Sequence, residues 1–209
     1  DFEIKKRNNE FKEDNFLISS YGFALPNKGL EILVEAVNLL HISGQKVYMN
    51  MFNAEYENPL SKEVIKNVKD KIDSCKLNDY ILLDTKYSND NEVLEKLSKS
   101  DLVLYPYQQS SESTSGAVRV GIASGANVVV TPLPIFKDVA PAVNFLPGFG
   151  AKEIAFYISE FIKSKNLIEI NQTFKEKNEI ASKWRESHRY SIIAVRLYNM
   201  IMSLYTNFD

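Results

Sequence analysis

The chain has 209 residues, of which 44% are hydrophobic and 11% aromatic, and its formal net charge is −2. This apolar content can cover both faces of a parallel sheet, and a near-neutral chain without a sustained basic stripe argues against nucleic acid as the main partner. A single cysteine excludes an intrachain disulfide, and no apolar run approaches the ~20 residues needed to span a bilayer.

The first 15 residues are polar, and we interpret them as an N-terminal segment or linker before one folded unit over 16–209. The sequence begins with Asp1 rather than methionine. We therefore expect a fragment that lacks a partner domain.

The first predicted elements are a strand over Phe16–Ser19 and a long amphipathic helix that starts near Leu30 and that Gly44 closes. The loop between them contains Gly22 and the pair Lys28-Gly29. A lone lysine is most often solvated, but its position after a strand and a glycine loop favours a phosphate contact for Lys28.

Further apolar runs alternate between strand and helix patterns along the chain, which predicts an α/β fold with a doubly wound parallel sheet. The expected elements after the first helix are a strand over 46–52, a helix over 62–75, a strand over 80–83 and a short helix over 91–97. Asn89-Asp90-Asn91 is best interpreted as the cap of that short helix.

The segment 100–139 contains two short apolar strands, Leu102–Tyr105 and Asn127–Thr131, separated by a polar loop and a helix start. A helix N-terminus presents unpaired backbone N–H groups and a partial positive charge, so it can hold a diphosphate. The alternative is that one hydroxyl residue of this loop merely caps the helix. The loop reads Glu112, Ser113, Thr114, Ser115 and Gly116 and leads into Ala117.

The last predicted elements are a strand over 143–146, a helix that runs through Ile162, and two helices within 174–204 that break near 186–190. Many apolar residues occur in the final helix pattern, and we expect them to lack their partner in this chain. His41 and His188 are far apart, and neither shows the spacing of a metal ligand.

Taken in order, these motifs resemble the C-terminal, donor-binding half of GT-B glycosyltransferases, specifically the retaining family-four (group 1) enzymes. Gly22 and Lys28 fall where that family has a glycine and a diphosphate-binding lysine, and Glu112 falls at the first glutamate of its Glu-x7-Glu motif. Two positions depart from the pattern. Phe23 occupies the place of an arginine, and Val120 that of the second glutamate.

The resemblance implies a site for a nucleoside-diphosphate sugar at the carboxyl ends of the strands. Lys28 and the backbone N–H groups of Ser115, Gly116 and Ala117 would neutralise the diphosphate. Glu112 would contact the sugar, and the loop Thr85–Tyr87 would cover the base. Arg119 is either a substitute for the missing arginine or a surface residue. The implied catalytic residues are Glu112 and Lys28, and the implied donor-binding residues are Gly22, Lys28, Thr85, Tyr87, Glu112, Ser113, Thr114, Ser115, Gly116, Ala117 and Arg119.

No cofactor or metal is expected, because the sequence has no Asp-x-Asp motif after a strand and the implied chemistry is stabilisation of the leaving group. The expected partners are the nucleotide-sugar donor, a saccharide or lipid-linked acceptor, and the missing N-terminal acceptor domain. We expect a cytoplasmic protein that contacts the inner membrane face through its missing half.

Three functional hypotheses remain open at this point. The first is the donor domain of a retaining transferase in cell-surface polysaccharide or glycoconjugate synthesis, inactive as an isolated half. The second is a degenerate domain of the same fold that acts as a binding or scaffolding module, motivated by Phe23 and Val120. The third is an unrelated nucleotide-binding domain, which should carry Gly-x-Gly-x-x-Gly after the first strand, whereas only Gly22 and Gly29 are present.

Overall fold

The computed structural model describes residues 16–164 and 168–205. Its sheet has six parallel strands in the order β3-β2-β1-β4-β5-β6, which confirms the predicted α/β class and doubly wound topology. The predicted polar segment 1–15 lies outside the described residues. The strands are β1 (Phe16–Phe23), β2 (Val47–Ala54), β3 (Ile81–Asp84), β4 (Leu102–Tyr105), β5 (Val128–Val130) and β6 (Asn144–Phe145).

The helices follow the strands in alternation, and their starts obey local capping rules. The Asn58 side chain accepts a hydrogen bond from the Leu60 N–H, and Pro59 occupies the first helical position, so α2 begins three residues before the predicted Lys62. Asn89 caps α3 as predicted. The helices are α1 (Leu30–Ile42), α2 (Pro59–Ser74), α3 (Asp90–Ser98), α4 (Gly116–Ala123), the 3-10 helix η1 (Pro134–Ala142), α5 (Ala151–Ser164), α6 (Ile168–Ser187) and α7 (Tyr190–Tyr205).

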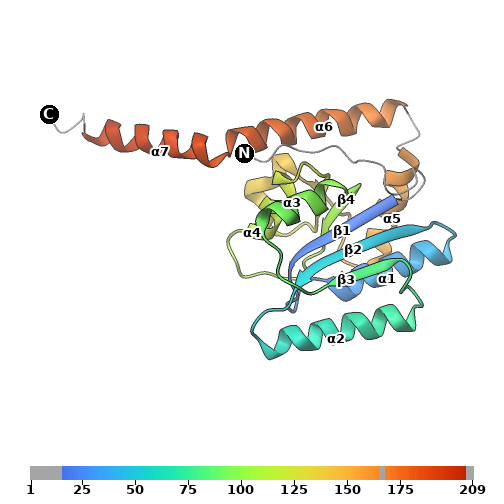
Figure 1. Cartoon of the computed structure of the whole chain (residues 1–209). Helices are drawn as coiled ribbons and strands as arrows, with labels where there is room; N and C mark the ends of the chain where they lie inside the picture. The colour runs from blue at the N-terminus through green and yellow to red at the C-terminus, as the bar shows by residue number, and fades with distance from the viewer. Residues whose placement is uncertain (1–15, 165–167, 206–209) are drawn as a thin grey trace.

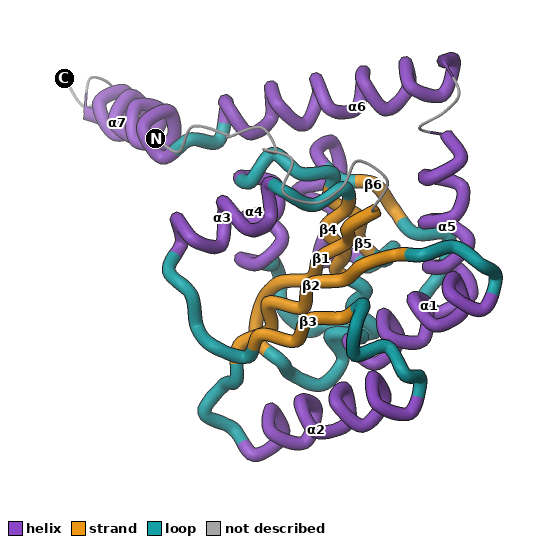
Figure 2. The backbone as a smooth tube through the Cα atoms, turned by 45° about the vertical axis from the view of Figure 1, so that its right-hand side comes forward, coloured by secondary structure: helices purple, strands orange, loops and turns teal. Residues whose placement is uncertain are grey.

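Two helical layers cover the sheet, with α1, α2 and α5 on one face and α3 and α4 on the other (Figure 2). The 3-10 helix η1 packs into the same buried cluster as α3 and α4. Each face has its own buried cluster. Ile18 and Leu33 belong to the cluster under α1, and Val103 and Phe136 belong to the cluster under α4. The strands are therefore buried on both sides, as their continuous apolar runs predict.

Strand β1 is the pivot of the sheet, because the strand order reverses between it and β4. It runs four residues beyond the predicted Ser19, since β2 pairs with it along its whole length as far as Phe23. Buried polar contacts fix its position against the turn before β4: Ser19 bonds Ser100 at 2.7 Å, and the Leu17 N–H donates to Asp101 at 2.8 Å.

The 3-10 helix η1 was not predicted from the sequence. It contains Pro134 at its start and Pro141 inside it, and prolines are typical of loops in sequence patterns. Its apolar side chains nevertheless point inward, and Ile135, Phe136 and Val139 are buried. The following strand β6 is shorter than the predicted 143–146.

The chain ends in two long helices that break where predicted, since α6 ends at Ser187 and α7 begins at Tyr190. Helix α6 contacts η1 and α4, whereas α7 extends away from the sheet domain (Figure 1). No residue of α7 is buried. None of the described helices is long and apolar enough to cross a membrane. The large apolar side chains that α7 exposes are Tyr190, Ile192, Ile193, Val195, Leu197, Tyr198, Met200, Ile201, Met202, Leu204 and Tyr205.

Candidate functional site

Two loops meet where β1 and β4 end, at the reversal of strand order. The loop after β1 contains Lys28, and the loop after β4 leads into α4. Gly22 lies so close to α4 that a Cβ atom there would be 3.3 Å from the Ala117 Cβ, and the Gln108 N–H donates to the Asn27 carbonyl at 2.7 Å. Ligands of open α/β sheets bind at such a reversal, outside the carboxyl ends of the strands.

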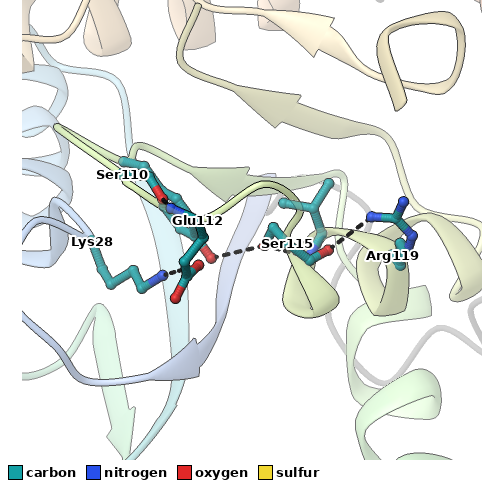
Figure 3. Close-up of polar contacts among 7 residues, drawn as sticks. Lys28, Ser110, Glu112, Ser115 and Arg119 are labelled. Carbon is teal, nitrogen blue, oxygen red and sulfur yellow. Dashed lines mark hydrogen bonds and ion pairs between the residues drawn. The ribbon is translucent and has the colours of Figure 1, made fainter. Parts of the chain in front are cut away.

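Lys28 projects from the first loop toward the second (Figure 3). Its ammonium nitrogen lies 3.8 Å from a Glu112 carboxylate oxygen and 3.9 Å from the centre of the Tyr107 ring. The Lys28 side chain is only 19% exposed. Within the described chain, no group accepts a hydrogen bond from this ammonium. Its N–H donors are therefore available to an anion.

The start of α4 is organised by Ser115, which is buried. The Ser115 hydroxyl accepts a hydrogen bond from the Val118 N–H at 3.4 Å and also bonds the Tyr107 hydroxyl at 3.2 Å. Ser115 thus acts as the helix cap, which the sequence left open as one of two possibilities. Its hydroxyl is engaged with the protein, and the neighbouring N–H groups are left for a ligand.

The N–H groups of Gly116 and Ala117 have no acceptor among the described residues. A Cβ atom built at Gly116 would have nothing within 4 Å. Gly116 is exposed and Ala117 is half-buried, so the positive end of α4 is open to solvent at Gly116. An unpaired pair of N–H groups beside a mostly buried ammonium is a suitable environment for a diphosphate.

The loop ahead of α4 is exposed. Glu112 is 61% exposed, and its own N–H donates to the Ser110 hydroxyl at 3.1 Å. Ser113 and Thr114 are exposed as well. The structure brings Glu112 to Lys28, as the order of the motifs predicts, while contacts of Ser113 and Thr114 with a donor stay a prediction.

Arg119 lies on the far side of Ser115 from Lys28 (Figure 3). Its guanidinium forms an ion pair with Asp138 of η1 and donates to the Ser115 carbonyl at 3.4 Å. This arrangement agrees with the surface interpretation of Arg119, and it does not put a second cation beside Lys28. A part for Arg119 in donor binding stays a prediction.

Three aromatic rings gather at the ends of β1, β2 and β3. Phe23 packs against Tyr56 at 4.9 Å and stacks with Tyr87 at 6.3 Å between ring centres. Tyr87 is 72% exposed and Phe23 38%. The Thr85 carbonyl accepts a hydrogen bond from the Glu55 N–H, which ties the loop after β3 to the loop after β2. Thr85 and Tyr87 therefore lie at the same sheet edge as Lys28, separated from it by Phe23.

Tyr105 fixes α4 to the sheet from below. Its hydroxyl donates to the Ala117 carbonyl at 2.7 Å, and a Cβ atom at Gly121 would lie 2.5 Å from that hydroxyl oxygen. Burial raises the pKa of Tyr105 well above its usual value, so the hydroxyl stays neutral and keeps donating. This close approach requires a glycine at position 121. The contact fixes the distance between the sheet and the start of α4.

The sequence analysis did not identify Tyr107 as a site residue, although its ring contacts Lys28 and its hydroxyl contacts Ser115. An aromatic residue just after a buried strand usually belongs to the core, and Tyr107 is indeed buried.

Within the described ranges, no group of three or more His, Cys, Asp or Glu residues could hold a metal ion.

Comparison with known proteins gives structural matches only. No family model matches the sequence, and no curated protein matches it. The fold matches a sucrose-phosphate synthase from Thermosynechococcus elongatus with a TM-score of 0.73 and 12% identity, over 94% of this chain and 47% of that one. It matches HepE from Anabaena, solved in complex with UDP and glucose, with a TM-score of 0.68 and 14% identity, over 91% of this chain and 49% of that one.

A third match is an isolated domain, the C-terminal domain of a group 1 glycosyl transferase from Francisella tularensis. Its TM-score is 0.61 at 15% identity, and the match covers 79% of this chain and 80% of that domain. The chain therefore has the fold of the C-terminal half of GT-B glycosyltransferases, and it spans about half the length of the longer proteins it matches.

Proposed function

We propose that this chain is the donor-binding half of a glycosyltransferase that takes its sugar from a nucleoside diphosphate. The observation that carries the proposal is the Lys28 ammonium, which is mostly buried, has no hydrogen-bond acceptor among the described residues and lies next to the loop that leads into α4. The fold supports it, because solved structures with the same fold are named as glycosyltransferases and one is described with bound UDP.

The diphosphate of the donor would lie between Lys28 and the N–H groups of Gly116 and Ala117. When the bond between the sugar and the diphosphate breaks, negative charge develops on the leaving oxygen. A fixed ammonium and fixed N–H dipoles stabilise that charge without having to reorganise, which is where such a site gains most of its rate. No cofactor and no metal ion are part of this proposal.

Glu112 would hold hydroxyl groups of the transferred sugar. Its carboxylate is near Lys28 but largely exposed, so it can turn toward a sugar attached to the diphosphate. In the ligand-free protein it accompanies the lysine as an ion pair of 3.8 Å. Water screens the largely exposed Glu112 carboxylate and the pair is long, so it contributes little to stability, roughly 0–1 kcal/mol, and breaking it on binding costs little.

The base would lie toward the sheet edge formed by Thr85 and Tyr87, beyond Phe23. The acceptor would be a saccharide or a lipid-linked saccharide, and the sugar would keep its anomeric configuration on transfer. The product would be a cell-surface polysaccharide or glycoconjugate. We place the reaction in the cytoplasm, at the inner membrane face when the acceptor is lipid-linked. These points rest on the family resemblance of the motifs.

A second domain is part of the proposal, because an active site between two halves needs both. Helix α7 supports this, since it exposes eleven large apolar side chains and buries none of its residues. Soluble proteins rarely expose an apolar surface of that extent without a partner. We propose that the acceptor half covers α7.

Titration of the chain with UDP, GDP, CDP and ADP, followed by backbone amide NMR, tests the donor site. The expected result is saturable shifts for one nucleotide, largest at Gly22, Lys28 and Ser115 to Ala117. Its sugar conjugate should add shifts at Glu112. Shifts confined to other loops, or no response to any nucleotide at millimolar concentration, would refute the proposed site.

A degenerate binding module is the second candidate, and the ring cluster favours it. Phe23 packs against Tyr56 and Tyr87. An apolar ring cluster therefore stands where the family that the sequence resembles has an arginine for the diphosphate. Val120 is half-buried and packs on the cluster under α4. If the ribose site is otherwise intact, Val120→Glu should tighten nucleotide binding. No gain in a variant that is still folded would favour the module.

A further inference from the structure

We infer that Tyr107 is a positioning residue whose ring fixes the Lys28 ammonium beside the N-terminus of α4. The inference rests on the proposed function, because it concerns the part of that site that would bind the diphosphate. It assigns a role to a residue outside the recognised motifs. It also identifies the side chain that connects Lys28 to the N-terminus of α4, which come from different loops.

The Tyr107 side chain contacts both Lys28 and Ser115. The Lys28 ammonium nitrogen lies over its ring at 3.9 Å from the ring centre, well inside the ~6 Å reach of a cation–π contact. At the other end of the side chain, the hydroxyl bonds the Ser115 hydroxyl at 3.2 Å, and Ser115 caps α4. One rigid side chain therefore spans from the cation to the helix start.

Tyr107 is itself held firmly. Its carbonyl accepts a hydrogen bond from the Thr131 hydroxyl at 2.6 Å, and its ring packs on Phe136 at 5.3 Å. Tyr107 and Thr131 are both buried. The ring therefore has a fixed place in the core under α4, and the Lys28 ammonium lies over it.

The ring matters because, in the part of the chain that the structure describes, Lys28 has no other short-range partner of fixed position. Its ion-pair partner Glu112 lies on an exposed loop, and the 3.8 Å separation is too long for a hydrogen bond. A lysine side chain loses much rotamer freedom when it is immobilised. A ring that immobilises it beforehand removes that cost from the binding step and leaves the N–H donors free.

Graded fluorination of the ring tests this role. Replacing Tyr107 by phenylalanine, then by mono- and trifluorinated phenylalanine, withdraws electron density from the ring face while nearly preserving its size. Tyr107→Phe is the reference, so the lost hydroxyl is common to the series. Tyr48 receives the same replacements as a control, because it packs on another ring at 5.4 Å near the start of β2, away from the site.

Inorganic pyrophosphate is the probe, because it has no base or sugar and therefore reports on the diphosphate-binding site alone. Its affinity should fall stepwise along the Tyr107 series, by about three- to tenfold in total, which is the range of a single cation–π contact. The Tyr48 series should not change it. Equal affinities throughout the Tyr107 series would overturn the inference, because a purely packing role depends on ring size alone.

The contact can also be read in the ligand-free protein. Protons above an aromatic face are shifted upfield in NMR spectra, so the Lys28 ε-methylene protons should resonate upfield of those of Lys71, and the difference should vanish in Tyr107→Leu. Ordinary shifts for Lys28 would overturn the inference. Failure of every diphosphate to bind would instead refute the proposed function, while the ε-proton shifts still decide whether the ring holds the ammonium.

Discussion

The backbone of Gly29 lies against the carbonyl oxygen of Pro106, and a Cβ atom at Gly29 would come within 2.1 Å of that oxygen. Gly29 also has a φ of 71°, in the left-handed region where only glycine is unstrained. The contact joins the loop that follows β1 to the loop that follows β4. Lys28 is thereby placed next to the residues that lead to α4.

Gly29→Ala should therefore be costly to the fold. Backbone strain of about 1–2 kcal/mol adds to a steric clash of about 1–3 kcal/mol, so we expect a loss of roughly 3 kcal/mol in the free energy of unfolding. Gly44→Ala is the matched control, because Gly44 has a φ of 84° but nothing within 4 Å of a Cβ atom. Its loss should be about 1 kcal/mol. Equal losses in urea denaturation would contradict the close contact at Gly29.

Gly116→Ala separates binding from folding. A methyl group at this position meets no protein atom within 4 Å, and alanine is a better helix former than glycine by about 1 kcal/mol. The melting temperature should stay the same or rise. Affinity for a nucleoside diphosphate should fall at least fivefold, because the methyl group would project into the open space at the start of α4, where the diphosphate is proposed to bind. An unchanged affinity in calorimetric titration would show that the ligand does not approach the helix there.

Glu112→Gln should affect the sugar and spare the diphosphate. The side chain is largely exposed, so the free energy of unfolding should hardly change. Removing the carboxylate frees the Lys28 ammonium, and binding of the nucleoside diphosphate alone should not weaken. The additional affinity of the sugar conjugate should be lost, and transfer by the two-domain protein should fall about tenfold or more. Full transfer activity would exclude the role given to Glu112.

Removal of α7 should leave the domain folded. A chain that stops after Arg189 loses no buried residue among those described in 190–205, so the unfolding transition should shift little. Self-association should decrease, since the exposed apolar surface of α7 is gone. Sedimentation velocity and thermal melts of the two chain lengths give the comparison. Loss of cooperative unfolding in the shorter chain would mean that α7 is part of the domain core.

The sequence predicted the sheet well where strands have clear ends. β4 matches its predicted range to the residue, because Asp101 and Pro106 bound a fully apolar run. The 3-10 helix η1 was missed because its turns form around two prolines, whose pattern resembles that of a loop. Strand β1 was predicted too short, because its last residues are ordered by pairing with β2 and not by their own apolar character.

The same distinction applies to the site. Lys28 and Glu112 could be brought together from the sequence, since the carboxyl ends of neighbouring parallel strands meet at one sheet edge. The contact partners of Tyr107 and Arg119 could not be predicted from the sequence. The first requires knowing that a buried ring faces the loop after β1, and the second requires the position of Asp138 on a helix that the sequence does not reveal.

Calorimetric titration of the wild-type chain, Lys28→Met and Lys71→Met with UDP, GDP, CDP and ADP tests the central claim most directly. Lys71 is the matched control, because it pairs with Glu35 at 3.3 Å on the helices away from the site. The account predicts that one diphosphate binds wild type and Lys71→Met equally, and Lys28→Met about ten- to hundredfold more weakly, as expected for a lost charge-assisted hydrogen bond. Equal binding by all three chains, or binding by none, would contradict it.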